Sequence, residues 1–257
     1  MKIVTYNVNG LRSAISKGLL AWVEAELPDV LCLQEIKALP KDIDMAPWEA
    51  LGYKAYWHPA QKLGYSGVAT FSRLPVERSA MGTGIEKYDL EGRMLLTQHG
   101  SLHILNTYMP SGSSGDERQA FKYEWLADFL PIATKALADY KQLIICGDYN
   151  ICHKAIDIHN PKSNAKSSGF LPEERAWMDS FVAAGFVDPF RLLHPDGVEY
   201  SWWSYRAGAR GKNLGWRIDY LMLSPALAAE ARGLHHAADA KHSDHCPVVL
   251  ELALGGR

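Results

Sequence analysis

The chain has 257 residues, of which 47% are hydrophobic, and a formal net charge of −2. This length and composition predict a globular fold with a large core, as one α/β domain or two small ones. The nearly balanced charge excludes a protein that binds nucleic acid through its overall charge, so any such contact must use a local basic patch.

The N-terminal sequence and the cysteines indicate the cellular compartment in which the protein is expected. The N-terminus runs directly into a predicted strand, with no basic leader and no cleavage site, so we expect no signal peptide. No apolar run is long enough to cross a bilayer. Cys32 and Cys146 lie inside apolar runs, as expected of small buried residues in a reducing compartment. We therefore expect a soluble cytoplasmic protein.

Residues 2–8 are predicted to form the first strand, which ends at Asn7 and Asn9. Their spacing places both amides on the same side. They provide either neutral oxygen ligands and phosphate donors, or only the turn for which Asn and Gly are ordinary residues.

Arg12 and Lys17 follow on the way into a predicted helix over residues 19–27, where they could contact phosphate. The apolar face of that helix is formed by Leu19, Leu20, Val23 and Leu27. The next predicted strand, residues 30–35, ends at Glu35. A carboxylate on a rigid strand end is a candidate ligand for a hard metal ion.

Residues 53–58 and 68–72 are predicted to be two further strands. The loop between them combines Lys62, Tyr65 and glycines. This composition fits a contact with a DNA backbone, and it fits an ordinary surface loop equally well.

The turn Glu91-Gly92-Arg93 leads into a predicted strand over residues 94–99, and residues 102–108 form the next. That strand ends at Tyr108, just before a flexible loop. Tyr108 is either a phosphate-binding phenol or a tyrosine at the edge of the core.

Residues 116–139 give the longest helical pattern. Phe121, Trp125 and Phe129 recur at four-residue intervals, as in a helix packed against a sheet. We assign this helix no function.

Residues 142–150 are predicted to form a strand buried on both faces, which Gly147 ends. Asp148 and Asn150 lie two apart at its mouth, where extended geometry would turn both to the same side. Together they can hold a water molecule or a hard metal ion, although Gly, Asp and Asn are also common in turns.

The segment 151–169 is too long for a structural connection, which indicates a binding loop. Lys162, Asn164 and Lys166 could reach phosphate there. Pro172 is expected to open a helix. Residues 200–205 form an aromatic cluster, followed by Arg206, Arg210 and Lys212; these side chains stack on a nucleotide or pack a strand.

Asp219 lies within the apolar alternation of a predicted strand over residues 213–223. Burying a carboxylate alone costs several kcal/mol, so we expect a partner. His245 is the natural one, because an Asp–His pair fixes the imidazole tautomer and raises its basicity. Asp244 and His245 are expected to enter the final strand.

Eight polar residues therefore lie at or near the ends of predicted strands. They are Asn7, Glu35, Tyr108, Asp148, Asn150, Asp219, Asp244 and His245. Carboxylates, amides and one histidine converging on a sheet edge fit magnesium and a phosphodiester; zinc would require more His and Cys. No repeat or linker divides the chain, so we expect one domain over residues 1–257.

Seven motifs in order resemble the exonuclease III / AP endonuclease family, within the endonuclease–exonuclease–phosphatase superfamily. They are Asn7-Val8-Asn9-Gly10-Leu11-Arg12, Leu33-Gln34-Glu35, Gly64-Tyr65-Ser66-Gly67-Val68, Glu91-Gly92-Arg93, Gly147-Asp148-Tyr149-Asn150, Gly215-Trp216-Arg217-Ile218-Asp219-Tyr220 and Ser243-Asp244-His245-Cys246-Pro247. Each motif alone is weak, but the ordered series is specific.

The resemblance implies a four-layered αββα sandwich of two packed mixed β-sheets flanked by helices. It implies Mg²⁺-dependent cleavage of duplex DNA 5′ to abasic sites, with Mn²⁺ as a substitute and one or two ions bound. Trimming of blocked 3′ ends and 3′→5′ exonuclease action are the usual companions. The alternative is mainly a 3′→5′ exonuclease and 3′-phosphodiesterase with weak abasic incision. A monomer is expected.

The resemblance also implies roles. Glu35 would be the principal metal ligand, surrounded by Asn7, Asn9 and Asp244, with Asp148, Asn150 and His245 as further ligands. Asp148 and Asn150 would activate water, His245 and Asp219 would stabilise the phosphate, and Tyr108 would support the leaving oxygen. Substrate contacts would come from Asn9, Arg12, Lys17, Tyr65, Arg93, Asn164, Trp202, Trp216 and Ile218.

Four positions depart from the pattern of some relatives, which have Asp in place of Asn9, Asn in place of Ser111 and Ser167, and Phe in place of Trp202. The change at Asn9 removes one charge beside the metal ligands. Trp202 is bulkier and would tighten the sugar pocket.

Overall fold

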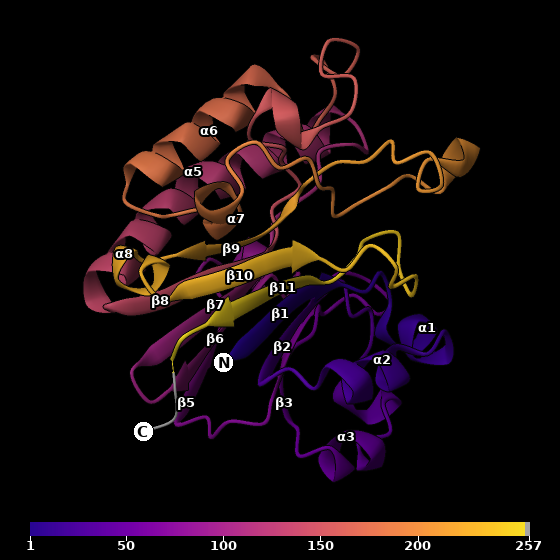
Figure 1. Cartoon of the computed structure of the whole chain (residues 1–257), viewed down its shortest axis with the longest axis vertical. Coiled ribbons are helices and arrows are strands. Elements are labelled where there is room, and N and C mark those ends of the chain that lie inside the picture. The colour runs from indigo at the N-terminus through magenta and orange to yellow at the C-terminus, as the bar shows by residue number, and fades with distance from the viewer. Residues whose placement is uncertain (255–257) are drawn as a thin grey trace.

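The computed structural model describes residues 1–254 as two β-sheets packed face to face, with helices on both outer sides (Figure 1). The strands are β1 (Lys2–Asn7), β2 (Val30–Gln34), β3 (Lys54–His58), β4 (Val68–Ser72), β5 (Arg78–Met81), β6 (Met94–His99), β7 (Leu102–Tyr108), β8 (Gln142–Asp148), β9 (Asp219–Leu223), β10 (Ala231–His236) and β11 (Val248–Leu252). The α-helices are α1 (Leu11–Ser16), α2 (Leu19–Glu26), α3 (Ala46–Ala50), α4 (Glu86–Asp89), α5 (Asp116–Asp139), α6 (Pro172–Ala183), α7 (Pro189–Leu193) and α8 (Pro225–Ala228). Short 3₁₀ turns occupy Pro40–Asp42, Ala155–Asp157 and Arg206–Gly208.

One sheet has the order β10-β11-β1-β2-β4-β3 and the other has the order β5-β6-β7-β8-β9. Strand β1 is parallel to β2, and β7 is parallel to β8. The remaining neighbours are antiparallel, so both sheets are mixed. This arrangement confirms the predicted four-layered α/β sandwich.

Strand alternation explains which residues form each core. In β1, Ile3 faces the opposite sheet, whereas Val4 and Tyr6 pack in the outer cluster with α1 and α2. In β8, Ile144 and Cys146 join the same inner cluster as Ile3. Every second residue of the central strands is therefore committed to the space between the sheets.

Toward one end of the sandwich this inner space becomes polar. Nε2 of Gln34 donates to Oδ1 of Asn106 in the opposite sheet at 2.7 Å, and to Oγ1 of Thr5 at 2.9 Å. Asn7 and Asp148 occupy the next inward positions along β1 and β8. Buried polar groups are tolerated where they are hydrogen-bonded to one another.

The outer helices close the sandwich on both sides. Trp125 and Phe129 of α5 pack with Phe181 of α6 against the second sheet. Val23 of α2 and Trp48 of α3 cover the first sheet. The aromatic stripe predicted in residues 116–139 is therefore core packing, as expected.

Several predicted boundaries were wrong. The strand predicted over residues 213–223 begins only at Asp219, and the last strand begins at Val248, so Asp244 and His245 lie in the loop before it. Leu27 was assigned to the apolar face of a helix, but it follows the last residue of α2, with φ 48°, and is 38% exposed. Strand β5 was missed because its residues are largely exposed.

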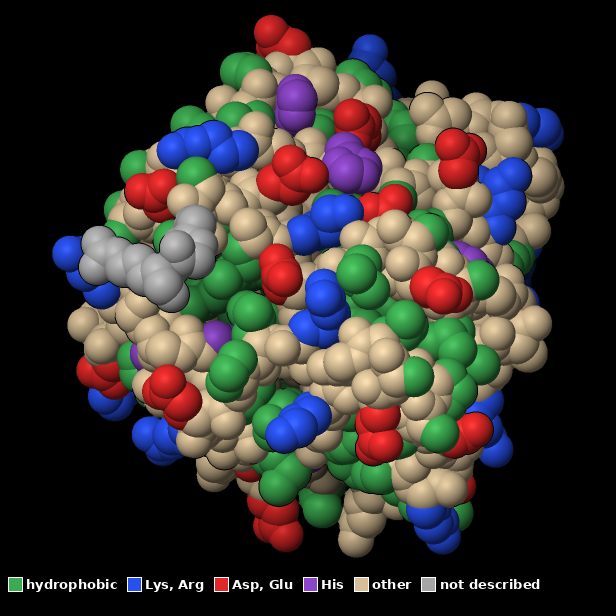
Figure 2. All heavy atoms as spheres, turned by 60° about the horizontal axis from the view of Figure 1, so that its bottom comes forward, with side chains coloured by type: hydrophobic (Ala, Val, Ile, Leu, Met, Phe, Trp, Pro, Cys, Tyr) green, Lys and Arg blue, Asp and Glu red, His purple; other side chains and the backbone are tan. Residues whose placement is uncertain are grey.

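The surface agrees with the nearly neutral charge. Basic and acidic side chains are interspersed on the face seen in Figure 2, without a broad region of either sign. Within residues 1–254, no helix has both the length and the hydropathy needed to cross a membrane. Cys32 and Cys146 are buried and free, as predicted.

We predict that His99, at the end of β6, makes the folded state less stable at low pH. Burial lowers the pKa of His99 to about 4, against 6.5 for an unperturbed histidine. The unfolded chain therefore binds the proton first, and the contribution of His99 is complete above pH 6.5 and lost as the pH falls toward 4. Between pH 7 and 4.5, we expect the free energy of unfolding of the wild type to fall by about 2–3 kcal/mol more than that of His99→Gln. Urea unfolding at both pH values measures this difference, and equal losses in the two proteins would contradict it.

Candidate active site

Asp148 is the last residue of β8 and is 1% exposed. It faces the opposite sheet because it has the same parity as Ile144 and Cys146. Burial and the carboxylate of Asp219 raise the pKa of Asp148 to about 7, although His245 opposes the shift. A carboxylate with a pKa near neutrality can accept a proton from water, as a general base must.

A sharp turn after β8 fixes this carboxylate. Asn150 has φ 53°; its backbone N–H donates to Oδ1 of Asp148 at 2.8 Å, and its Nδ2 donates to Oδ2 at 3.2 Å. A Cβ on Gly147 would lie 1.8 Å from the carbonyl oxygen of Thr107, so only glycine fits there. The predicted contact of Asp148 and Asn150 is present, but a turn brings the two together and not an extended strand.

His245 and Asp219 form the predicted pair. Nδ1 of His245 lies 2.9 Å from Oδ2 of Asp219, and both residues are buried. Nε2 of His245 points toward Asp148, 3.9 Å from its Oδ2. Burial lowers the pKa of His245, but the charges of Asp219, Asp148 and Asp244 outweigh it and raise the pKa to about 10. His245 is therefore a cationic hydrogen-bond donor at neutral pH.

Glu35 contributes the second carboxylate. Ligand atoms of Glu35, Asp148 and His245 all lie within 4.8 Å of one another, close enough to hold a metal ion. Burial raises the pKa of Glu35, but Lys37 and Asn7 outweigh it and lower the pKa, so Glu35 is ionised. Two carboxylates without a thiolate favour a hard, oxygen-binding cation over zinc. Because His245 is protonated in this arrangement, the carboxylates are the better ligands.

Asn7, predicted as a metal ligand, turns its amide nitrogen toward the two carboxylates. Its Nδ2 donates to Oε1 of Glu35 and to Oδ2 of Asp148, both at 2.9 Å. Its Oδ1 accepts the backbone N–H of Asn9 at 3.0 Å. Asn7 therefore holds the two carboxylates at a fixed separation.

Asn9 and Asp244 also have other partners. Oδ1 of Asn9 accepts from Nζ of Lys37 at 2.6 Å, and Nδ2 of Asn9 donates to Oδ1 of Asp244 at 3.0 Å. Nε1 of Trp202 donates to the other oxygen of Asp244 at 3.0 Å. Asp244 lines the pocket but lies outside the three-residue cluster formed with Glu35. It fixes the indole of Trp202.

Tyr108 ends β7, next to Asp148 in the sheet register. Burial, and then the charge of Glu35, raise the pKa of Tyr108 well above its usual range, so the phenol keeps its proton. The guanidinium of Arg93 lies 4.8 Å from the ring centroid. Tyr108 can therefore donate a hydrogen bond into the pocket that it lines.

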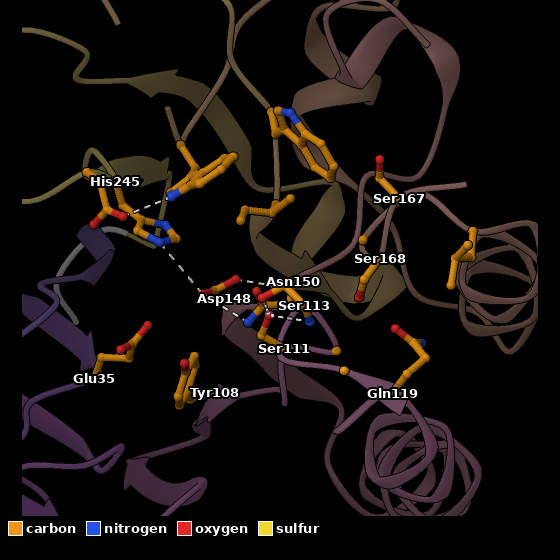
Figure 3. A pocket seen from close by; sticks show the side chains of 18 of the residues that line it. Glu35, Tyr108, Ser111, Ser113, Gln119, Asp148, Asn150, Ser167, Ser168 and His245 are labelled. Carbon is orange, nitrogen blue, oxygen red and sulfur yellow. Dashed lines mark hydrogen bonds and ion pairs between the residues drawn. The ribbon is translucent and has the colours of Figure 1, made fainter. Parts of the chain in front are cut away.

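These groups open into one pocket of about 730 Å³. Figure 3 shows Asp148 at its base between His245 and Asn150, with Glu35 and Tyr108 beside them. The lining also includes the apolar side chains of Trp202, Trp216 and Ile218. The two indoles meet edge to face, with ring centroids 5.7 Å apart. The pocket thus joins a charged floor to an apolar wall.

Two of the predicted DNA contacts, Arg12 and Tyr65, lie at a second, smaller groove. Arg12 and Lys17 are exposed. Arg12 and Tyr65 line the groove, which has a volume of about 260 Å³ and also contains Lys37, Lys41 and Lys62. Its lysines and arginine form a local basic patch, as the balanced net charge requires.

Arg93 and Asn164 were predicted to bind substrate, and both side chains have partners within the protein. Arg93 is 1% exposed and pairs with Glu91 at 2.6 Å, so it supports Tyr108 from inside the protein. Nδ2 of Asn164 donates to the carbonyl oxygens of His159 at 3.0 Å and Asn160 at 3.1 Å. The amide of Asn164 is thus used within its own loop.

Sequence reasoning missed several residues at the site, among them Lys37, Gln119 and Ser168. Lys37 lies 2.9 Å from Glu35 and bridges it to Asn9. Gln119 and Ser168 line the pocket from α5 and from the long loop. The position of Lys37 two residues after Glu35 was an available signal, whereas Gln119 looked like an ordinary polar residue of an amphipathic helix.

Two packed sheets with a buried aspartate, an Asp–His pair and an acidic metal-binding cluster at one edge define a metal-assisted hydrolase. The model of the Endonuclease/Exonuclease/phosphatase family matches residues 4–245. The chain belongs to this family, and within it to the group of exodeoxyribonucleases and AP endonucleases that its motifs resemble.

Similar proteins cover nearly the whole chain. An exodeoxyribonuclease of Bacillus subtilis (strain 168) is 40% identical over 252 residues, which is 97% of this chain and 98% of that protein. A DNA-(apurinic or apyrimidinic site) endonuclease of Dictyostelium discoideum is 40% identical over 261 residues, covering 99% and 71%. A variant of the 3′ phosphatase NExo from Neisseria, solved with product DNA hairpin, matches with a TM-score of 0.91 and 26% identity, covering 98% and 99%.

Proposed function

We propose that the chain is a magnesium-dependent DNA-repair phosphodiesterase. It cleaves duplex DNA 5′ to abasic sites, and it trims blocked 3′ ends and acts as a 3′→5′ exonuclease. The observation that carries this proposal is that Asp148 and His245, whose ring is paired with the buried Asp219, line the same pocket as the indoles of Trp202 and Trp216. An apolar wall beside a phosphate-binding floor fits a baseless sugar, which leaves the duplex without breaking a base pair.

The residues of the pocket supply acid–base and electrostatic chemistry. Asp148 takes a proton from the attacking water, and Asn150 and Asn7 hold its carboxylate in place. The charged imidazole of His245 donates to a phosphate oxygen as negative charge builds there. Tyr108 donates to the phosphate or to the leaving oxygen.

The carboxylate cluster fits Mg²⁺, with Mn²⁺ as a substitute. Glu35 is the principal ligand, because it is ionised and faces Asp148 across the pocket floor. A bound ion acts as a Lewis acid toward a phosphate oxygen. Among the described residues, Glu35, Asp148 and His245 form the cluster that would hold the ion, and one or two ions are proposed.

Duplex DNA with abasic sites or blocked 3′ ends is the proposed partner, bound by a monomer of this catalytic unit in the cytoplasm. The solved relative bound to a DNA hairpin supports a DNA partner. The Bacillus subtilis relative is an exodeoxyribonuclease, which supports a bacterial type of enzyme that acts on DNA.

A second candidate is an enzyme that acts mainly at 3′ ends, with weak abasic incision. It is favoured by the structural match to a 3′ phosphatase over 98% of this chain. The two candidates share the chemistry at Asp148 and differ in whether an internal site can enter the pocket.

One assay separates them. The substrate is a duplex with one internal abasic analogue and blocked ends, incubated first with Mg²⁺ and then with EDTA. We expect a single metal-dependent nick 5′ to the analogue. Absence of that nick, together with digestion of a second duplex that has an unblocked 3′ end, would establish the second candidate.

Arg12 should contribute one phosphate contact. We expect Arg12→Ala to weaken binding of any duplex sequence and to reduce the slope of log K against log salt by about 1. Fluorescence anisotropy between about 50 and 200 mM salt measures the slope. Arg232→Ala is the control, because Arg232 is exposed on β10 and lines neither of the two pockets above. An unchanged slope for Arg12→Ala would remove Arg12 from the interface.

A further inference from the structure

A buried ion pair lies beneath the pocket. Lys122 of α5 and Glu174 of α6 have fully buried side chains, and Nζ of Lys122 lies 2.5 Å from Oε1 of Glu174. Neither residue lines the pocket described above.

Lys122 reaches the turn that holds the general base. Its Nζ donates to the backbone carbonyl oxygen of Asn150 at 2.8 Å. The N–H of the same Asn150 donates to Asp148 at 2.8 Å. Asn150 keeps a left-handed conformation, φ 53°, which asparagine tolerates but does not prefer. The bond from Lys122 holds the turn in this conformation.

Glu174 binds a second segment that lines the pocket, residues 169–171. Its Oε2 accepts the backbone N–H groups of Gly169 at 2.7 Å and Leu171 at 3.0 Å. Both residues line the pocket. Its Oε1 also accepts from Nε2 of Gln119, another lining residue, at 3.1 Å.

The segment 169–171 and the turn 148–150 are in close contact. A Cβ added to Gly169 would lie 3.1 Å from the carbonyl oxygen of Asn150 and 2.9 Å from the ring of Trp216. A small shift of either segment would therefore move the sugar-facing indole relative to Asp148. Packing alone does not require charges here, because a buried ion pair can often be replaced by apolar residues without loss of stability. What the pair supplies is a set of directed bonds to both segments.

We propose that Lys122 and Glu174 are positioning residues for the reaction. They hold the turn 148–150 and the segment 169–171 in a fixed relative position. The phosphate of a bound substrate is thereby held at a fixed distance from Asp148. This inference rests on the proposed function for its catalytic consequence. Misplacing a reacting group by about 1 Å can cost about 10²-fold in rate.

The double variant Lys122→Met with Glu174→Met tests the proposal. Methionine is unbranched, forms helices well and leaves no buried charge unpaired. We expect a Tm close to that of the wild type, a KM within about twofold, and kcat lower by about 10- to 100-fold. Phe129→Leu is the control for stability, because Phe129 is buried in the same helix without touching the site; it should lower Tm and leave kcat unchanged.

A second readout does not depend on activity. Hydrogen exchange at the Gly169 and Leu171 amides should be faster in the double variant, because both amides lose their acceptor. Rates are compared on abasic duplex and on a recessed 3′ end, using whichever DNA the wild type cleaves. If the wild type cleaves neither DNA, the proposed function fails. Faster exchange at the Gly169 and Leu171 amides in the double variant would still support the role of Lys122 and Glu174 in holding the two segments. A stable double variant with wild-type kcat or wild-type exchange would overturn the proposal.

Discussion

Asp148→Asn should lower kcat by about 10²- to 10⁴-fold while leaving the affinity for DNA nearly unchanged. Asparagine has almost the same shape as aspartate and can still accept the backbone N–H of Asn150, which donates to Oδ1 of Asp148 in the wild type. It cannot take a proton from water. The loss should therefore appear in the chemical step, which single-turnover cleavage measures, and not in the dissociation constant.

The matched control for this substitution is Asp139→Asn. Asp139 is the last residue of α5, and its only side-chain partner among the described residues is the exposed Lys135. Binding is measured by fluorescence anisotropy in EDTA, so that cleavage does not consume the probe. If Asp148→Asn cleaves at the wild-type rate, Asp148 is not the base, whatever the control does.

The charged part of the site was predictable because its signals are local. Asp148 and Asp219 each terminate or begin a strand at an inward-facing position, where apolar residues occupy the other inward positions. A polar residue at such a position must be paired or catalytic. The two-sheet sandwich followed only from the ordered motifs, because strand patterns alone do not say which strands share a sheet.

The contacts that the sequence did not reveal depend on tertiary partners. Arg93 has the composition of a surface contact, but Glu91 and the ring of Tyr108 make its burial favourable. The amide of Asn7 could equally have presented its oxygen or its nitrogen, and two facing carboxylates decide that it presents nitrogen. Lys122 lies on a helix whose pattern indicates only core packing, so its partner 52 residues later was not visible.

Asp219 and His245 should behave as one catalytic unit. Asp219→Asn and His245→Gln should each lower kcat by about 10²- to 10³-fold, as expected when a preorganised donor to the developing charge is lost. The double variant should be little worse than His245→Gln alone, because residues that act together are not additive. Independent losses that multiply in the double variant would contradict the pairing seen at 2.9 Å.

The pH profile gives this pair a second signature. In the wild type, the charges of Asp219, Asp148 and Asp244 outweigh burial and hold the pKa of His245 at about 10, so the imidazole remains a cationic donor throughout the neutral range. Removing the charge of Asp219 lowers the pKa of His245 toward the value that burial favours. The proton on Nε2 is then lost at lower pH, and the alkaline limb of the kcat profile of Asp219→Asn should move to lower pH. Because His245→Gln has no proton to lose there, its alkaline limb should not respond to the state of Asp219, and a common limb in all three proteins would mean that another group controls it.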